Sequence, residues 1–259
     1  MIFQRVLFPI LSLPLYFLFT SCGNPMQAFY DELKKYGYVP YTTPLQVAGT
    51  GTLIGGSPNQ MMIIANPSTC FPDVNERGIR FRDDTALPST KAHFYVQTDI
   101  QVSFMKALGT GAPSINAGVH LKDISTMELQ FNGVHIEYFD SVKLVDYYRN
   151  HMSSLCMDYL DRVGFIIQAI VADQMKFTLF TSDGGQVQLS VQNINQYFDL
   201  SANVQWQIDR TASLIITTPK YIGYQLGELR KKDKGIGLRR ATKVLANKWI
   251  FSDESIFHD

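Results

Sequence analysis

The chain of 259 residues lacks the patterns by which most enzymes and nucleic-acid-binding proteins are recognised. Its formal net charge is zero, which excludes a bulk attraction to nucleic acid. Its three cysteines do not have metal-site spacing, and its five histidines form no pair at i, i+4. The glycine-rich stretch 49–56 matches no phosphate-binding motif. We therefore predict no catalytic residue, no enzymatic activity, no cofactor, no metal and no nucleic-acid partner.

Hydrophobic residues, in contrast, are plentiful enough to form a folded core. They make up 46% of the chain, and 12% of all residues are aromatic. Such a composition excludes a disordered tether. No internal repeat of solenoid length is visible, so we expect one large domain.

The N-terminus carries the one long apolar run. A single cation, Arg5, precedes an apolar stretch from Val6 to Phe19, which is the pattern of a signal peptide. A membrane-spanning helix needs about 20 apolar residues, and Pro9 and Pro14 would interrupt one. We therefore assign residues 1–21 to a signal peptide and exclude them from the fold.

The residues that end this run resemble the lipobox of bacterial lipoproteins. Thr20-Ser21 directly precede Cys22, although Phe19 stands where that family usually has Leu. The resemblance implies that Cys22 carries a diacyl anchor, which is sufficient for stable membrane attachment. It implies a place in the bacterial cell envelope, and Gly23 implies the outer membrane where the cell has one. The alternative is an ordinary cleaved signal or an uncleaved anchor, with Cys22 incidental.

The other two cysteines, Cys70 and Cys156, form an even pair in a chain that we expect to be exported. A disulfide between them would contribute about 4 kcal/mol in the chain-entropy model. The alternative is two buried thiols that act as small hydrophobic residues.

Alternating apolar residues predict a sheet-rich body. The longest alternation runs from Phe94 to Phe104, and others lie at 115–121, 127–131, 175–181 and 186–191. Asn132-Gly133 predicts a tight turn, and Asp183-Gly184-Gly185 predicts a hairpin. Short helices are expected at 24–36, ending at Gly37, and at 141–150 and 155–160. The fold class is α+β, with a large, mostly antiparallel twisted sheet, and residues 22–230 form its single domain.

The segment 231–259 is predicted to be a separate, basic C-terminal element. Between Arg230 and Lys248 the chain holds eight cations against Asp233 alone. Apolar residues from Leu238 to Trp249 recur near helical spacing, which predicts a basic amphipathic helix. Its candidate contacts to anionic lipid or to an envelope protein are Arg239, Arg240, Lys243 and Lys248. The alternative is a helix that packs its apolar stripe on the body.

The order of these patterns resembles the pore-forming domain of bacterial gasdermins. The shared features are the strand 94–104, the stretch Gly109-Thr110-Gly111-Ala112-Pro113, the helix 141–150, the apolar strand 163–171 and the closing strands 213–229. The N-terminal Lys34-Lys35-Tyr36-Gly37-Tyr38 also looks like the opening of these proteins. The resemblance covers roughly residues 26–230 and contains no diagnostic motif.

If it holds, the resemblance implies a homo-oligomeric membrane pore built from two hairpins, 94–121 and 163–191. The residues expected on membrane-inserting strands are Phe94, Val96, Ile100, Val102, Phe104, Phe165 and Ile167. It also implies that the C-terminal segment restrains the pore former until it is released. A core-facing strand explains the alternation equally well, and bacterial gasdermins are not normally exported. A non-enzymatic structural or partner-binding envelope lipoprotein is therefore the alternative function.

Overall fold

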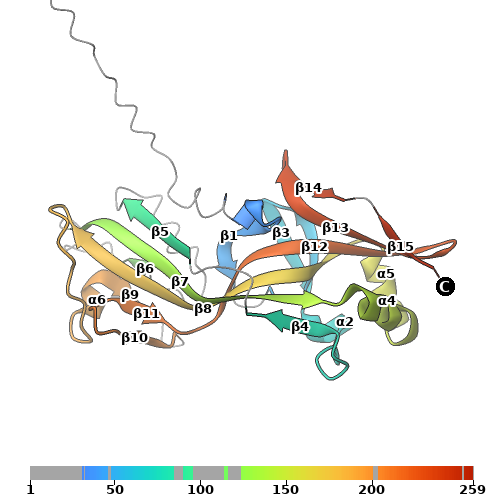
Figure 1. The fold of residues 1–259 in the computed structure, drawn as a ribbon, viewed down its shortest axis with the longest axis horizontal. Coiled ribbons are helices and arrows are strands. Elements are labelled where there is room, and N and C mark those ends of the chain that lie inside the picture. The colour runs from blue at the N-terminus through green and yellow to red at the C-terminus, as the bar shows by residue number, and fades with distance from the viewer. Residues whose placement is uncertain are drawn as a thin grey trace, which may run out of the picture.

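In the computed structural model the chain folds around one 13-stranded sheet, and every strand pair among the described residues is antiparallel (Figure 1). The structure describes residues 31, 33–45, 48–84, 90–95, 114–115, 124–200, 204–252 and 254–258. The expected α+β fold, a large antiparallel sheet with a few short helices, is confirmed.

Two long central strands run along the length of the molecule (Figure 1). They are β7 (Ile124–Phe139) and β8 (Gly164–Thr181), which pair from Ile124 opposite Thr181 to Tyr138 opposite Gln168. The predicted turn at Asn132-Gly133 is wrong, because β7 continues through both residues. Gly133 has a φ of 61°, which bends the strand without ending it.

The remaining strands extend this pair on both edges. On the outer edge of β7 lie β4 (Arg80–Asp83) and β5 (Thr90–Tyr95). On the other edge of β8 lie β2 (Leu53–Ser57), β12 (Lys220–Lys232) and β11 (Leu214–Ile216). Further out, β3 (Gln60–Ala65) pairs with β2, β1 (Val39–Leu45) with β12, and β10 (Trp206–Ile208) with β11. A two-stranded sheet joins β6 (Ser114–Ile115) to β9 (Phe198–Asp199).

The two helices predicted after residue 140 are confirmed, and two single helical turns occur that the sequence analysis did not predict. These are α4 (Ser141–Asn150) and α5 (Ser154–Leu160), with single turns at α2 (Pro67–Cys70) and α6 (Ile194–Tyr197). Asp140 Oδ1 caps α4 by accepting from the backbone N–H groups of Val142 and Lys143. The helix before β1 ends as predicted at Gly37, whose φ is 75°. No helix in the described part of the chain is long and apolar enough to cross a membrane.

The C-terminal segment is part of the sheet, and the prediction of an amphipathic helix there is wrong. Residues 235–257 form β13 (Gly235–Leu245), β14 (Lys248–Phe251) and β15 (Ser255–Phe257). β13 pairs with β12, and both β14 and β15 pair with β13. The open edge of β12 offers backbone hydrogen bonds, and Leu238 lies opposite Leu229 there. This pairing outweighs a weak helical periodicity that Gly235 and Gly237 already disfavour.

Candidate functional site

The sheet has two halves of different construction, which we call the far half and the near half. The far half comprises β5, β10, β11, residues 124–132 of β7 and residues 174–181 of β8. The near half holds the other ends of β7 and β8 with β12, α4 and α5. In Figure 1 the far half lies at the left and the near half at the right.

The β7–β8 pair of the far half has one apolar face and one polar face. The apolar face is fully buried and consists of Met127, Leu129, Phe131, Met175, Phe177 and Leu179. The opposite face carries polar side chains that are half-buried, among them Glu128, Gln130, Gln174 and Lys176. Such alternation over about nine to eleven residues is also what a membrane β-strand requires.

In the resting molecule this apolar face is covered by the chain that follows β8. Its covering side chains are Leu189, Ile194, Phe198 and Val204, and the ring centroids of Phe177 and Phe198 lie 6.0 Å apart. The cover begins at the predicted hairpin turn, where Thr181 N–H donates to Gly185 O at 2.8 Å and Gly184 has a φ of 83°. The face is therefore a core surface, and described side chains that follow β8 form part of its cover.

A second turn closes the edge of the far half. Asp209 accepts from the N–H groups of Thr211 at 2.9 Å and Ser213 at 3.0 Å, and Lys176 Nζ lies 2.7 Å from its carboxylate. Burial raises the pKa of Asp209, but these donors outweigh burial and leave the pKa at about 2. The ion pair ties the β10–β11 turn to β8.

The two halves meet at a bend where a glycine of β7 lies opposite a carboxylate of β8. Gly133 faces Asp173, and the second edge of β8 changes its partner from β12 to β11 beyond Ala172. The buried His135 has its Nδ1 3.5 Å from Asp173 Oδ1, and Arg82 reaches the other carboxylate oxygen at 3.2 Å. The positive φ of Gly133 and the change of partner along β8 thus occur at the same level of the sheet.

Lys220 begins β12 at the same level of the sheet. It lies opposite Ala172 and is only 1% exposed. Burial lowers the pKa of its amine, because the charged form is poorly solvated there.

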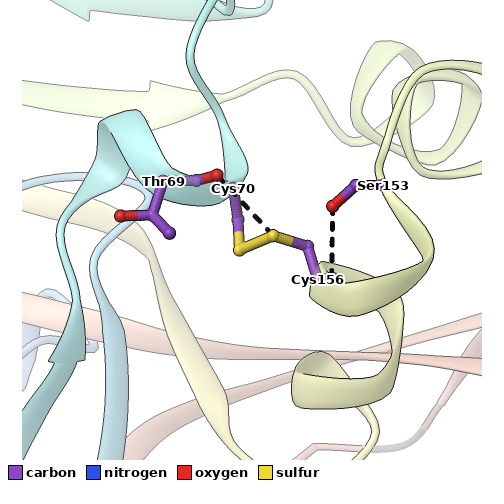
Figure 2. The surroundings of a disulfide bond; sticks show 4 residues. All are labelled: Thr69, Cys70, Ser153 and Cys156. Carbon is purple, nitrogen blue, oxygen red and sulfur yellow. Dashed lines mark hydrogen bonds between the residues drawn. A yellow bond between two sulfur atoms is a disulfide. The ribbon is translucent and has the colours of Figure 1, made fainter.

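A disulfide bond cross-links two helices of the near half (Figure 2). The sulfur atoms of Cys70 and Cys156 are 2.01 Å apart and join α2 to α5. The bond lies beside the backbone of Thr69 and near the capping hydroxyl of Ser153, which accepts from Cys156 N–H at 3.3 Å. Both cysteines are 3% exposed and belong to the core that packs α4 and α5 on the sheet.

Phe165 and Ile167, which the sequence places on a membrane-inserting strand, lie in this stapled core. Both are fully buried, and the Phe165 ring contacts that of Phe71 at 5.6 Å. The two-faced stretch of β8 instead begins beyond Asp173. On the other predicted strand, Phe94 lies on β5 opposite Met127, while Val96, Ile100, Val102 and Phe104 lie outside the described residues. Cys22 also lies outside them.

The four predicted basic contacts differ in their surroundings. Arg239 lies 3.7 Å from Glu228 and over the ring of Phe251. Arg240 bonds to Ser141, and burial lowers the pKa of its guanidinium. Of the four, Lys243 and Lys248 alone are exposed. Among the four candidates, these two lysines are therefore the ones that remain accessible for a lipid contact.

Contacts that the sequence patterns did not predict hold the C-terminal end. The Arg149 guanidinium on α4 donates to Phe257 O at 2.8 Å and to His258 O at 2.9 Å. Lys232 pairs with Glu254 at 3.2 Å. The two-residue turns at 233–234 and 246–247 were the available signal, since such turns join antiparallel strands. No group of side chains that could hold a metal ion occurs in the described ranges.

These features define an α+β protein with a stapled near half and a two-faced, covered strand pair in its far half, a gasdermin-like fold. The model of the Bacterial Gasdermin Family matches residues 85–236, more than half of the chain, and the protein belongs to that family. A solved bacterial gasdermin from Bradyrhizobium tropiciagri is similar at a TM-score of 0.47 and 14% identity, over 82% of this chain and 89% of that one. No curated protein matches the sequence.

Proposed function

We propose that the protein is a lipid-anchored pore former of the bacterial cell envelope. In this proposal the far half opens into membrane-spanning hairpins, and several copies close a barrel. The observation that carries the proposal is the β7–β8 pair with one apolar and one polar face, whose apolar face is covered in part by the chain that follows β8, in a member of the bacterial gasdermin family.

The opening step follows from the edges of β8. Residues 186–191 already begin to pair with its end, since Val187 N–H donates to Leu179 O at 2.9 Å. To extend this hairpin towards the bend they must replace β11, which holds β8 at 175–177. The uncovered apolar face then meets lipid in place of the cover, and closure of the barrel satisfies the backbone.

The C-terminal strands are proposed to restrain this step through β12. β12 pairs with β13 at 226–232 and with β8 at 220–227, so it links the C-terminal strands to the central pair. Displacing β13–β15 would leave β12 with an unpaired edge and free β8 to shift at the bend. Cutting an engineered protease site in the 233–234 turn should therefore promote pore formation.

The anchor is proposed to be a diacyl group on Cys22, with residues 1–21 removed on export. Cys22→Ser should release the protein to the soluble fraction, because two acyl chains are needed for stable attachment. Attachment of this variant that persists at high salt, where contacts between exposed charges are screened, would contradict lipidation and leave the pore proposal untouched.

A disulfide lock tests the pore. Met175 and Ile216 lie opposite each other on β8 and β11, and paired side chains have Cβ atoms about 5 Å apart, close enough for a disulfide after small shifts. Met175→Cys/Ile216→Cys in a Cys22→Ser background should abolish dye leakage from anionic liposomes after the 233–234 cut. The matched control, Asn132→Cys/Gln174→Cys, joins β7 to β8, which stay neighbours in both states, and should leak normally.

The outcomes separate the two functions that the sequence allows. Leakage that the first lock stops and the control does not would support the opening of β8. Leakage unaffected by the first lock, once its disulfide is verified by mass, would refute that step. An absence of leakage from the cut, folded protein would favour the partner-binding lipoprotein.

A further inference from the structure

The hairpin of β13 and β14 has an exposed tip that the proposed pore does not use. The tip consists of residues 243–248, all of them exposed. Leu245 is 68% exposed and Val244 37%. On the same strand Ala241 is buried and is the last residue paired with β12, so the hairpin projects from the sheet beyond this residue. The hairpin therefore presents the side chains of Leu245 and Val244 to solvent at its end.

The conformation of the tip is fixed by its own turn and by hydrogen bonds to the neighbouring β2–β3 hairpin. Ala246 and Asn247 have φ values of 47° and 57°, as in the tight turns that join twisted strands. Asn247 Oδ1 accepts from the N–H of Asn59 at 2.8 Å, and its Nδ2 donates to Ser57 Oγ at 3.1 Å. The β2–β3 turn thus braces the tip.

The charge of the tip is of one sign. Lys243 and Lys248 flank Leu245, and the sequence has no acidic residue in 241–251 or in the bracing hairpin 53–66. Apolar side chains flanked by amines match the interface of a bilayer, where the apolar groups enter the acyl boundary and the amines meet phosphate. The chemistry therefore favours anionic phospholipid over a neutral protein surface.

The tip also lies beside the point where the N-terminal chain enters the fold. Gln225 Nε2 donates to Gly37 O at 3.0 Å, and a Cβ on Gly37 would lie 3.7 Å from Thr242 at the base of the tip. In Figure 1 the blue helical turn before β1 and the tip of β13 both lie on the upper side. Cys22 is nine residues before Asp31, a span of about 30 Å at most. An acyl anchor on Cys22 would hold this side of the molecule near the bilayer.

We propose that the tip 243–248 docks the resting protein onto anionic phospholipid and so fixes its orientation on the membrane. The inference rests on the membrane attachment in the proposed function and is independent of pore opening. The tip lies beyond residue 236, where the family match ends. One lysine near an anionic surface contributes about 1 kcal/mol, or about fivefold in binding, so the two together contribute about 25-fold.

A fluorescent label at single positions tests the orientation. In the full chain, Leu245→Cys carries an environment-sensitive dye such as NBD, with Cys70 and Cys156 in their disulfide and Cys22 replaced by serine. The control label is Lys234→Cys, in the turn at the opposite end of β13. Both are titrated with phosphatidylcholine vesicles, with and without phosphatidylglycerol, and with brominated acyl chains as quenchers.

We expect a blue shift and quenching at position 245 on anionic vesicles, with no response at position 234. Lys243→Ser/Lys248→Ser should raise the lipid concentration at half-response about 25-fold, whereas Lys231→Ser/Lys232→Ser should leave it nearly unchanged. An equal response at both labels, or none at 245 while the protein sediments with vesicles, would overturn the docking surface. So would a shift at 245 that follows protein concentration without lipid, since a second copy would then be the occupant. Absence of sedimentation with anionic vesicles would also overturn it, because the Cys22→Ser protein has no anchor and the tip is its proposed lipid contact. Failure of the anchor or of the pore is read separately, from the fractionation of Cys22→Ser cells and from dye leakage.

Discussion

Removal of the Cys70–Cys156 bond is expected to remove a large part of the protein's free energy of unfolding. The two cysteines are 86 residues apart, and the chain between them contains β4, β5, β7 and α4. In the chain-entropy model a loop of this length contributes about 4.5 kcal/mol to the free energy of unfolding. A typical domain has only about 5 to 15 kcal/mol in total, so Cys70→Ala/Cys156→Ala should unfold at much lower denaturant concentration.

The assay is urea unfolding of the oxidised protein, its chemically reduced form and the double variant, followed by tryptophan fluorescence. Reduced protein and double variant should agree within about 1 kcal/mol, because alanine removes only a small buried sulfur at each position. A loss below about 1 kcal/mol in both would refute the stabilisation expected from loop length. Alkylation of both thiols in unreduced native protein would refute the bond itself.

Three further predictions concern the bend, the far turn and the C-terminal end. Gly133→Ala should lower the free energy of unfolding in urea by about 1 to 3 kcal/mol, because residue 133 has a positive φ and an added Cβ would lie 2.8 to 2.9 Å from Asp173 atoms. Gly184→Ala should lower it less, because a Cβ added there meets open space. The pKa of Asp209 is about 2 in the folded protein, against an ordinary value of 3.8. The ionised carboxylate therefore stabilises the fold fully above pH 3.8, and this stabilisation is lost as the pH falls through about 2. Asp209→Asn should thus lose about 1 to 2 kcal/mol at neutral pH and match the wild type below pH 2, and equal losses at both pH values would contradict this. Arg149→Ala should speed hydrogen exchange in β15 by about fivefold, since each lost bond is worth about 1 kcal/mol, and unchanged exchange would show that the strand holds without it.

The family resemblance is carried by the order of patterns along the chain. Alternation correctly predicted strands at 127–131 and 175–181, and the helical pattern correctly predicted helices at 141–150 and 155–160. Alternation at 186–191 was wrong, since these residues form only an isolated bridge at Gln186, and most of 94–104 and 115–121 lies outside the described residues. The family match over 85–236 covers most of the same patterns. Periodicity was sufficient at 127–131 and 175–181 because these stretches bury one face and leave the other half-buried.

The predictions that failed did so where local pattern and tertiary context disagree. Residues 238–249 have a weak helical period, yet β12 presents an open edge that only the folded sheet creates. Asn132-Gly133 has the composition of a turn, yet β8 continues on the far side and keeps β7 extended. A local signal of this strength amounts to about 1 kcal/mol or less per residue, and pairing with a neighbouring strand outweighs it.

Composition and spacing along the chain were enough to establish the fold class, the pairing potential of two cysteines and the apolar N-terminal run. The folded sheet was needed to distinguish the part of β8 that has one buried and one half-buried face from the part that packs in the core beside α4 and α5. It was also needed to show that Arg239 and Arg240 are engaged while Lys243 and Lys248 are exposed at a braced tip. The reason is physical: burial and charge pairing depend on residues that are distant in sequence, and these meet only when the sheet has formed.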